Sequence, residues 1–419
     1  AYRAGGSRTS AGSASPTALA SALMAAAGGF PLECRSVPGR GRGLFATRDI
    51  LPGETVLVEA PLLLIPLPEF RDQVCAQCLR ALTAASSGLQ CTQCQQARFC
   101  SAECGQLAQA STGNHTPLLC RCLAASQPYV GGCSSEEVAQ LHFLLRALTL
   151  KLAAAQCPEA TAAFQALVSV VGDITPQMVP PVKVHQALCA TTAAAGLSPG
   201  PPMTIEEAAV LLRKEELNSY GVMAPSAAGG ERRIRGSGMY VHASLLNHEC
   251  LPNVVRYDDF DSPGPGNTRI SMRALAGIPA GSEVLQSYFP LNWSFRERQE
   301  RCQEQYGFQC GCPRCQLEQH WEEGESDMDG SEADEGSMEE EEEEAAPQAG
   351  PSAAEKGKAV MQTVESASMG DAAAEDDVQD TYQYMFITKH LCQHNECFGT
   401  MAPTAPNSEV LQCNMCGST

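Results

Sequence analysis

The sequence has no uninterrupted apolar run of about 18 residues, which is the length that a helix needs to cross a membrane. The longest apolar stretch, residues 56–67, is interrupted by Glu59 and by prolines. No membrane-spanning segment is therefore predicted.

Clustered positive charge is also missing. The net charge of −20 is accounted for by residues 317–380, which hold 22 acidic residues and two lysines, so the remainder is formally neutral. Because binding to a phosphate backbone needs clustered cations, direct DNA binding is not expected, although a peptide groove is not excluded. Residues 317–380 include six consecutive glutamates and are predicted to form a disordered acidic linker. The alternative is a segment that attracts basic, histone-like tails.

Acidic residues are absent from residues 1–29, which are mostly alanine, glycine and serine. This composition cannot build a core, so a disordered N-terminal extension is predicted. A transit peptide, which is also poor in acids, is the alternative.

Cysteine, in contrast, is abundant: 21 residues, most of them in C-x-x-C-like clusters. This usage favours zinc thiolates in a reducing compartment, the nucleus and/or the cytoplasm, over secreted disulfides. Eight nitrogen and sulfur donors fall within about 46 residues, enough for two four-coordinate zinc ions. A segment with so few large apolar residues would hardly fold without metal. The donors are Cys75, Cys78, Cys91, Cys94, Cys100, Cys104, His115 and Cys120, and Cys122 competes with Cys120.

Two further cysteine groups lie nearer the C-terminus. Three closely spaced residues, Cys310, Cys312 and Cys315, need a fourth ligand, for which Cys250 is the candidate; ordinary buried thiols are the alternative. The last group predicts a small zinc ribbon, with His390 and His394 as alternates. Its members are Cys392, Cys397, Cys413 and Cys416. We expect about four zinc ions per chain.

Residues 134–217 are rich in alanine and leucine, and their apolar residues recur at helical spacing from Val138 to Leu148. Proline and glycine near 175–202 divide this segment into several predicted helices. His142 and His185 are interpreted as packed or solvated side chains. Residues 30–65 predict a strand, a glycine turn and a strand.

The most distinctive motifs lie in residues 237–315. They are N-H-E-C at 247–250 followed by Pro252-Asn253, G-S-E-V-L-Q-S-Y at 281–288, and Y-G-F-Q-C-G-C-P-R-C at 306–315. Together they resemble the SET domain of protein-lysine methyltransferases. With the cysteine-rich insert, the chain is similar to the SET-and-MYND-domain group, and most of all to its plant branch, the proteins related to absent-small-or-homeotic-discs. Glu249 departs from the commoner N-H-S-C tetrad.

The resemblance implies an α+β fold with a β-rich SET core of short strands. A MYND zinc module and a helical insert split this core, and a post-SET zinc site and a C-terminal zinc-ribbon-like segment follow. The expected segments are 30–70 for the first part of the core, 71–122 for the MYND-type module, 123–235 for the helical insert, 236–290 for the catalytic core, 291–316 for the post-SET segment and 381–419 for the ribbon. The MYND pattern interleaves its ligands. It assigns Cys75, Cys78, Cys100 and Cys104 to one ion and Cys91, Cys94, His115 and Cys120 to the other.

The resemblance also implies an activity: transfer of a methyl group from S-adenosylmethionine to a deprotonated lysine amine of a histone or non-histone protein. By the same resemblance, Tyr288 provides the catalytic hydroxyl, Tyr306 lines the lysine channel and Phe308 packs on the adenine. The implied cofactor contacts are Gly41, Arg42, Gly43, Asn218, Asn247, His248, Tyr288 and Phe308.

Several alternatives remain open. Asn218 could simply cap a turn, and Tyr288 could be a core aromatic with a satisfied hydroxyl. The MYND module could dock a proline-rich peptide or act as a strut, and we favour the strut. The alternative for the whole chain is a catalytically silent SET/MYND scaffold that serves as a zinc-dependent interaction module.

Overall fold

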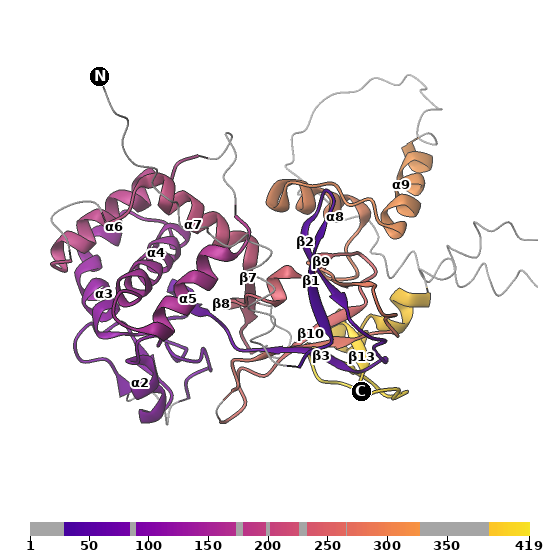
Figure 1. The fold of residues 1–419 in the computed structure, drawn as a ribbon, viewed down its shortest axis with the longest axis horizontal. Helices are drawn as coiled ribbons and strands as arrows, with labels where there is room; N and C mark the ends of the chain where they lie inside the picture. Colours follow the sequence, from indigo (N-terminus) through magenta and orange to yellow (C-terminus); the bar gives the residue numbers. More distant parts are fainter. Residues whose placement is uncertain are drawn as a thin grey trace, which may run out of the picture. The chain divides into compact units, whose positions relative to one another are not determined.

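The computed structural model, shown in Figure 1, describes seven stretches of the chain: 29–83, 89–172, 179–197, 202–225, 233–264, 266–326 and 385–419. The expected N-terminal extension, apart from residue 29, and residues 327–380 of the expected acidic linker lie outside these stretches. Within them, no helix combines the length and apolarity that a bilayer span requires. The chain divides into two compact units. Unit 1 comprises Ala1–Thr47, Val58–Leu245 and Asp258–Ile270, and unit 2 comprises Arg48–Leu57, Leu246–Tyr257 and Ser271–Thr419.

Unit 1 begins with an antiparallel hairpin of β1 (Leu32–Val37) and β2 (Gly41–Ala46). Gly39 and Gly41 have φ values of 73° and 77°, which glycine adopts without the penalty that a Cβ would bring. The predicted strand and glycine turn are therefore confirmed, and so is the following strand, β3 (Thr55–Glu59).

A three-stranded antiparallel sheet follows in unit 1, with β8 (Ile234–Met239) between β4 (Leu63–Pro66) and β7 (Ser219–Met223). A Cβ on Gly236 would lie 2.7 Å from the Ile65 carbonyl oxygen, so the central strand depends on glycine there. Beside it, a cluster of buried apolar residues holds the sheet against the short helix η1 (Pro68–Phe70).

Five helices form the larger core of unit 1: α3 (Pro117–Val130), α4 (Ser135–Ala153), α5 (Pro158–Ser169), α6 (Val182–Ala194) and α7 (Ile205–Asn218). Figure 1 shows α4 among the other four, all of which it contacts, and every residue from Leu141 to Leu150 is buried. Capping boxes begin α4 and α7. The helical periodicity predicted from Val138 to Leu148 is thus confirmed.

Two elements lie near the predicted boundaries of the helical insert. Helix α3 begins at Pro117, within the segment expected to be the MYND module, because Thr116 caps it and a proline suits the first turn. At the other end, residues 219–223 form β7, since their backbone pairs with β8. Before α3, the described residues of the MYND-type segment include β5 (Leu89–Gln90), β6 (Arg98–Phe99) and α2 (Ala102–Ala108).

Unit 2 contains a parallel pair of short strands, β9 (Asn247–His248) and β12 (Glu283–Gln286). It also holds most of a three-stranded sheet in which β11 (Ile270–Ala274) lies between β10 (Val254–Asp258) and β3. Helix α8 (Phe295–Arg301), a π-helical turn η3 (Cys302–Tyr306) and α9 (Pro313–Ser326) follow. The C-terminal segment has η4 (His394–Glu396) and the antiparallel strands β13 (Met401–Pro403) and β14 (Leu411–Cys413). The described residues therefore form an α+β fold of short strands and helices, as predicted.

Helix α9 corrects the predicted start of the acidic linker. Residues 317–326 are helical, not disordered. The physical reason is Glu318, whose carboxylate lies 2.7 Å from the Arg298 guanidinium and 2.6 Å from that of Arg314. This acidic side chain belongs to a buried ion-pair network within the helical part of the segment.

Candidate functional site

Four groups of side chains in the described residues could each hold a metal ion, and within each group the ligand atoms lie within 4.8 Å of one another. A tetrahedron with zinc–sulfur bonds of about 2.3 Å has sulfur–sulfur edges of about 3.8 Å. The sulfur–sulfur distances are 3.7 Å from Cys78 to Cys100 and 3.6 Å from Cys397 to Cys413, so the donors fit zinc. The groups contain the same residues as the expected ligand sets. They are Cys75, Cys78, Cys100 and Cys104; Cys91, Cys94, His115 and Cys120; Cys250, Cys310, Cys312 and Cys315; and Cys392, Cys397, Cys413 and Cys416.

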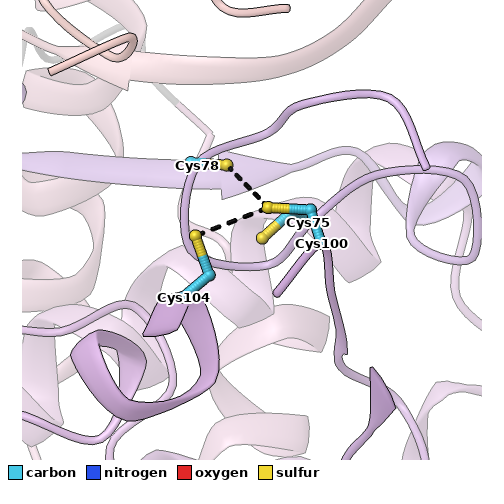
Figure 2. A group of neighbouring side chains, drawn as sticks. All are labelled: Cys75, Cys78, Cys100 and Cys104. Carbon is cyan, nitrogen blue, oxygen red and sulfur yellow. Dashed lines mark hydrogen bonds between the residues drawn. The ribbon is translucent and has the colours of Figure 1, made fainter. Parts of the chain in front are cut away.

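Figure 2 shows the first MYND group, in which Cys75 and Cys78 from one loop face Cys100 and Cys104 at the start of α2. In the second group, the His115 Nε2 atom lies 3.5 Å from the Cys94 sulfur. Burial lowers the pKa of His115 to about 4, so the ring is in the neutral form that binds metal.

Cys120 and Cys122 differ in their places on α3. The Cys120 sulfur lies 3.5 Å from that of Cys91, whereas Cys122 is fully buried in the helical core. At the C-terminal group, the alternate donor His390 has its Nδ1 atom 2.8 Å from the Met401 carbonyl oxygen, and neither it nor His394 belongs to the cluster.

The post-SET group has a surrounding shell that no sequence motif indicated. Arg298 is 1% exposed, and its Nε and Nη2 atoms donate to the sulfurs of Cys250 and Cys315 at 3.3 and 3.6 Å. Burial works against its charge, yet Glu318 and these two sulfurs raise the pKa of the guanidinium above its ordinary value. A cation beside thiolates offsets their negative charge and orients them.

Strand pairing places the N-H-E-C tetrad beside the end of β12. Asn247 is opposite Leu285, and its Nδ2 atom donates to the Glu283 carboxylate at 2.7 Å. Asn253 holds the same strand through two hydrogen bonds: it donates to the Glu283 carbonyl at 2.9 Å and accepts from the Leu285 amide at 2.7 Å. Glu249, the departure from the commoner tetrad, is half-buried, and its N–H continues the pairing with Gln286.

Half-buried aromatic rings gather at the end of β12. The Tyr288 hydroxyl donates to the Leu246 carbonyl at 3.1 Å, and its ring centroid lies 4.7 Å from that of Tyr306 and 5.1 Å from that of His248. Phe308 extends the group, 6.4 Å from Tyr306. The predicted residues Asn247, His248, Tyr288, Tyr306 and Phe308 thus lie together in unit 2.

The other predicted cofactor residues belong to unit 1. Gly41 has a positive φ and open space where a Cβ would project. Arg42 donates to the Ser169 carbonyl at 2.8 Å. Gly43 pairs with Arg35 within the hairpin. Asn218 ends α7 and donates its Nδ2 hydrogens to the carbonyls of Val171 and Lys214 at 2.6 and 2.7 Å, so a ligand contact would be made by Oδ1.

Comparison with known proteins bears on this arrangement. The family model of the SET domain matches residues 41–289. Histone-lysine N-methyltransferase ASHR2 of Arabidopsis thaliana is 34% identical over 92% of this chain and 94% of that protein. Human histone-lysine N-methyltransferase SMYD3 is 26% identical over 67% of this chain and 60% of that protein. Among solved structures, the SET domain of LSMT bound to lysine and AdoHcy covers 68% of this chain and 54% of that chain at 13% identity, with a TM-score of 0.29, a likeness too weak to carry an inference.

The SET-domain match spans more than half of the chain, and the likeness to ASHR2 covers nearly all of both proteins. This chain belongs to the SET-domain family, in its SET-and-MYND group.

Proposed function

We propose that this chain is a protein-lysine N-methyltransferase that uses S-adenosylmethionine. The observation that carries the proposal is the position of Tyr288. Its hydroxyl donates a hydrogen bond to the carbonyl of Leu246, the residue that precedes the N-H-E-C tetrad, and its ring packs on that of Tyr306. The named activities of the relatives ASHR2 and SMYD3, both histone-lysine N-methyltransferases, support the same reaction.

The cofactor supplies an already reactive methyl group, so the protein mainly has to align the amine with it. The amine of a free lysine has a pKa of about 10.4, and an apolar aromatic environment disfavours its charged form. In the proposed roles, Tyr288 orients the amine and Tyr306 lines the channel for the lysine chain. Phe308, also half-buried, offers a ring for the adenine.

The remaining assignments rest on the family resemblance. Asn247 and His248 are proposed as cofactor contacts, as are the glycine turn of Gly41, Arg42 and Gly43 and the end of α7 at Asn218. We propose zinc as the resident metal of all four cysteine groups, where it fixes loops and takes no part in the methyl transfer.

The proposed substrate is a lysine-bearing protein or peptide, histone or non-histone. The proposed compartment is the nucleus and/or the cytoplasm, because thiolate zinc sites suit a reducing environment. Direct DNA binding is not part of the proposal, since the chain outside the acidic segment is formally neutral.

For the MYND-type module we propose a strut first and a docking site for a proline-rich peptide second. The second role has the support of a hollow of about 410 Å³ lined by Leu89, Phe99 and Pro117 beside the second zinc group. Fluorescence anisotropy with a labelled proline-rich peptide tests it. Saturable binding that Phe99→Ala weakens supports docking, and no binding leaves the strut.

The experiment for the enzymatic proposal compares Tyr288→Phe with Tyr257→Phe. Tyr257 is the matched control, because its hydroxyl also donates to a backbone carbonyl, that of Gln412, outside the aromatic group. Tyr288→Phe should lower kcat about a hundredfold or more and leave S-adenosylmethionine affinity, measured by calorimetry, near that of the wild type. Tyr257→Phe should retain its kcat. Equal loss of binding and turnover would remove Tyr288 from the chemistry, and undetectable cofactor binding by zinc-loaded protein would favour the silent scaffold.

A further inference from the structure

His248 is 4% exposed, and both of its ring nitrogens face protein atoms. The Tyr288 backbone N–H lies 3.1 Å from Nδ1, and the Cys250 sulfur lies 3.2 Å from Nε2. A backbone N–H can only donate, so Nδ1 must accept. The ring proton therefore belongs on Nε2, from which it donates to the Cys250 sulfur.

The Cys250 sulfur is the point where this ring meets the post-SET metal group. Cys250 is fully buried, and its sulfur lies 3.5 Å from that of Cys315 and 3.8 Å from that of Cys310. It receives a second donor, Arg298 Nε, at 3.3 Å. Hydrogen bonds from buried donors to a metal-bound thiolate orient the ligand and strengthen metal binding.

The other end of the ring meets the backbone of the proposed catalytic residue. Tyr288 lies two residues after the end of β12; its backbone amide donates to Nδ1 of His248, and its hydroxyl donates to the Leu246 carbonyl. Tyr288 is therefore held at two places: the imidazole holds its backbone amide, and the Leu246 carbonyl holds its hydroxyl.

We infer that His248 is a positioning residue that links the post-SET zinc site to Tyr288. Its Nε2–H holds the Cys250 thiolate, and its Nδ1 holds the Tyr288 amide, so loading of this metal site orders the tyrosine. The inference deepens the proposed function and rests on it for the role of Tyr288. Because both ring nitrogens of His248 are then used for hydrogen bonds within the protein, any cofactor contact at this position is made by the backbone.

Two substitutions separate the two bonds. The amide of glutamine in His248→Gln reaches the place of Nε2, so it keeps a donor for Cys250 and loses the acceptor for Tyr288. The shorter asparagine in His248→Asn keeps an acceptor near Nδ1 and loses the donor. Zinc release to a chromophoric chelator and exchange of the Tyr288 amide hydrogen report on the two ends without any need for turnover.

His248→Asn should release one zinc per chain about tenfold faster than the wild type. His248→Gln should keep that zinc, exchange the Tyr288 amide about tenfold faster, and lower kcat with the peptide KM unchanged. Wild-type zinc release in the first variant, or wild-type amide exchange in the second, would overturn the inference.

The link itself is tested by weakening the metal site from its far side with Cys310→Ser. This change should speed hydrogen exchange of the Tyr288 amide in the wild-type background. In the His248→Gln background it should speed the exchange little further, because the hydrogen bond from that amide to position 248 is already lost. Equal acceleration in both backgrounds would show that zinc acts without His248. Should Cys310→Ser fail to fold, the glutamine and asparagine pair decides alone.

Phe289→Leu is the packing control. Its ring lies 4.5 Å from that of His248, and removing it disturbs the neighbourhood without removing either hydrogen bond. It should leave zinc release unchanged, and zinc loss that matches His248→Asn would contradict the inference. If the chain transfers no methyl group at all, the proposed function fails while the zinc and exchange measurements still decide whether this link exists.

Discussion

Buried charge makes single residues of unit 2 important for its stability. Arg298 and Arg314 are each 1% exposed and share one carboxylate, Glu318. Such a network contributes little net stability when complete, but loss of one member leaves charge buried without a partner.

We predict that Glu318→Gln lowers the free energy of unfolding by about 3 kcal/mol, because two buried guanidiniums lose their counter-charge. Denaturant unfolding measures the change. Glu300→Gln is the control, since Glu300 pairs with Arg296 on the surface and should cost less than about 1 kcal/mol. Equal costs for the two variants would contradict a buried network.

The buried imidazole of His142 in unit 1 predicts sensitivity to acid. Burial and the neighbouring Arg71, 2.7 Å from Nδ1, lower the pKa of His142 to about 3. Unfolded histidine takes up a proton near pH 6.5, and the folded chain does not. Protons therefore favour the unfolded state, and this contribution to stability is lost as the pH falls below about 6.5, by at most about 1.4 kcal/mol per pH unit.

His142→Gln should consequently flatten the fall in unfolding free energy between pH 7 and pH 5. Thermal or urea unfolding at several pH values measures it. His185→Gln, at a half-buried histidine whose ring meets the Met203 carbonyl, is the comparison. An unchanged slope in His142→Gln would show that other groups cause the acid sensitivity.

At the residue scale, the spacing of the cysteines predicted which side chains group as metal donors. It did not predict the residues that hydrogen-bond to those donors. The C-x-x-C pairs follow from zinc geometry, so their grouping could be anticipated. No local pattern connects Arg298 with Cys250, 48 residues away, or His248 with Tyr288. These contacts depend on how β9, β12 and α8 pack against one another, and this packing could not be predicted from the sequence.

At the element scale, the C-terminal segment is joined to the strands of unit 2. The Tyr257 hydroxyl of β10 donates to the Gln412 carbonyl at 2.5 Å, and Asn414 donates to the Arg256 carbonyl at 2.9 Å. Phe386, Leu391 and Ala402 pack on Val255 and Leu275. The ribbon is therefore part of the core of this unit.

Gly53, in the turn before β3, provides the sharpest test of that junction. A Cβ there would lie 2.1 Å from the Ala405 carbonyl oxygen, at a φ of 78°. We predict that Gly53→Ala costs about 3 kcal/mol or more and speeds amide exchange in β13 and β14. Gly281→Ala, at a φ of 81° with no atom within 4 Å of the added Cβ, should cost only about 1–2 kcal/mol. Equal costs would mean that the ribbon moves aside freely.

Elements with a strong local signal were predictable, and those that depend on distant partners were not. The helical spacing from Val138 to Leu148 indicated α4, and the glycine turn between two predicted strands indicated the hairpin that begins unit 1. Strand β7 forms because β8 lies beside it, and α9 includes the acidic Glu318, which pairs with two buried arginines.

At the scale of the whole molecule, cysteine groups occur in both units: two lie in unit 1 and two in unit 2. The MYND-type segment packs around its own cysteines with few large apolar side chains. Stability at this scale should therefore depend on metal.

We predict about four zinc ions per chain by elemental analysis of protein purified without chelator. Prolonged chelation should unfold the MYND-type segment before the helices α3 to α7, whose core is apolar. Circular dichroism and limited proteolysis follow the two events. A zinc content near two would mean that the post-SET or the C-terminal assignment is wrong.

The family and the α+β class could be read from the sequence because the motifs of residues 237–315 are specific in combination. The central claim, a lysine methyltransferase built on this SET core, is tested most directly by transfer of radiolabelled methyl from S-adenosylmethionine to a peptide array. The account predicts label on lysine-containing peptides with the zinc-loaded wild-type chain and about a hundredfold less, or lower still, with Tyr288→Phe. Label of equal strength from both proteins, or its absence from both, would contradict the account.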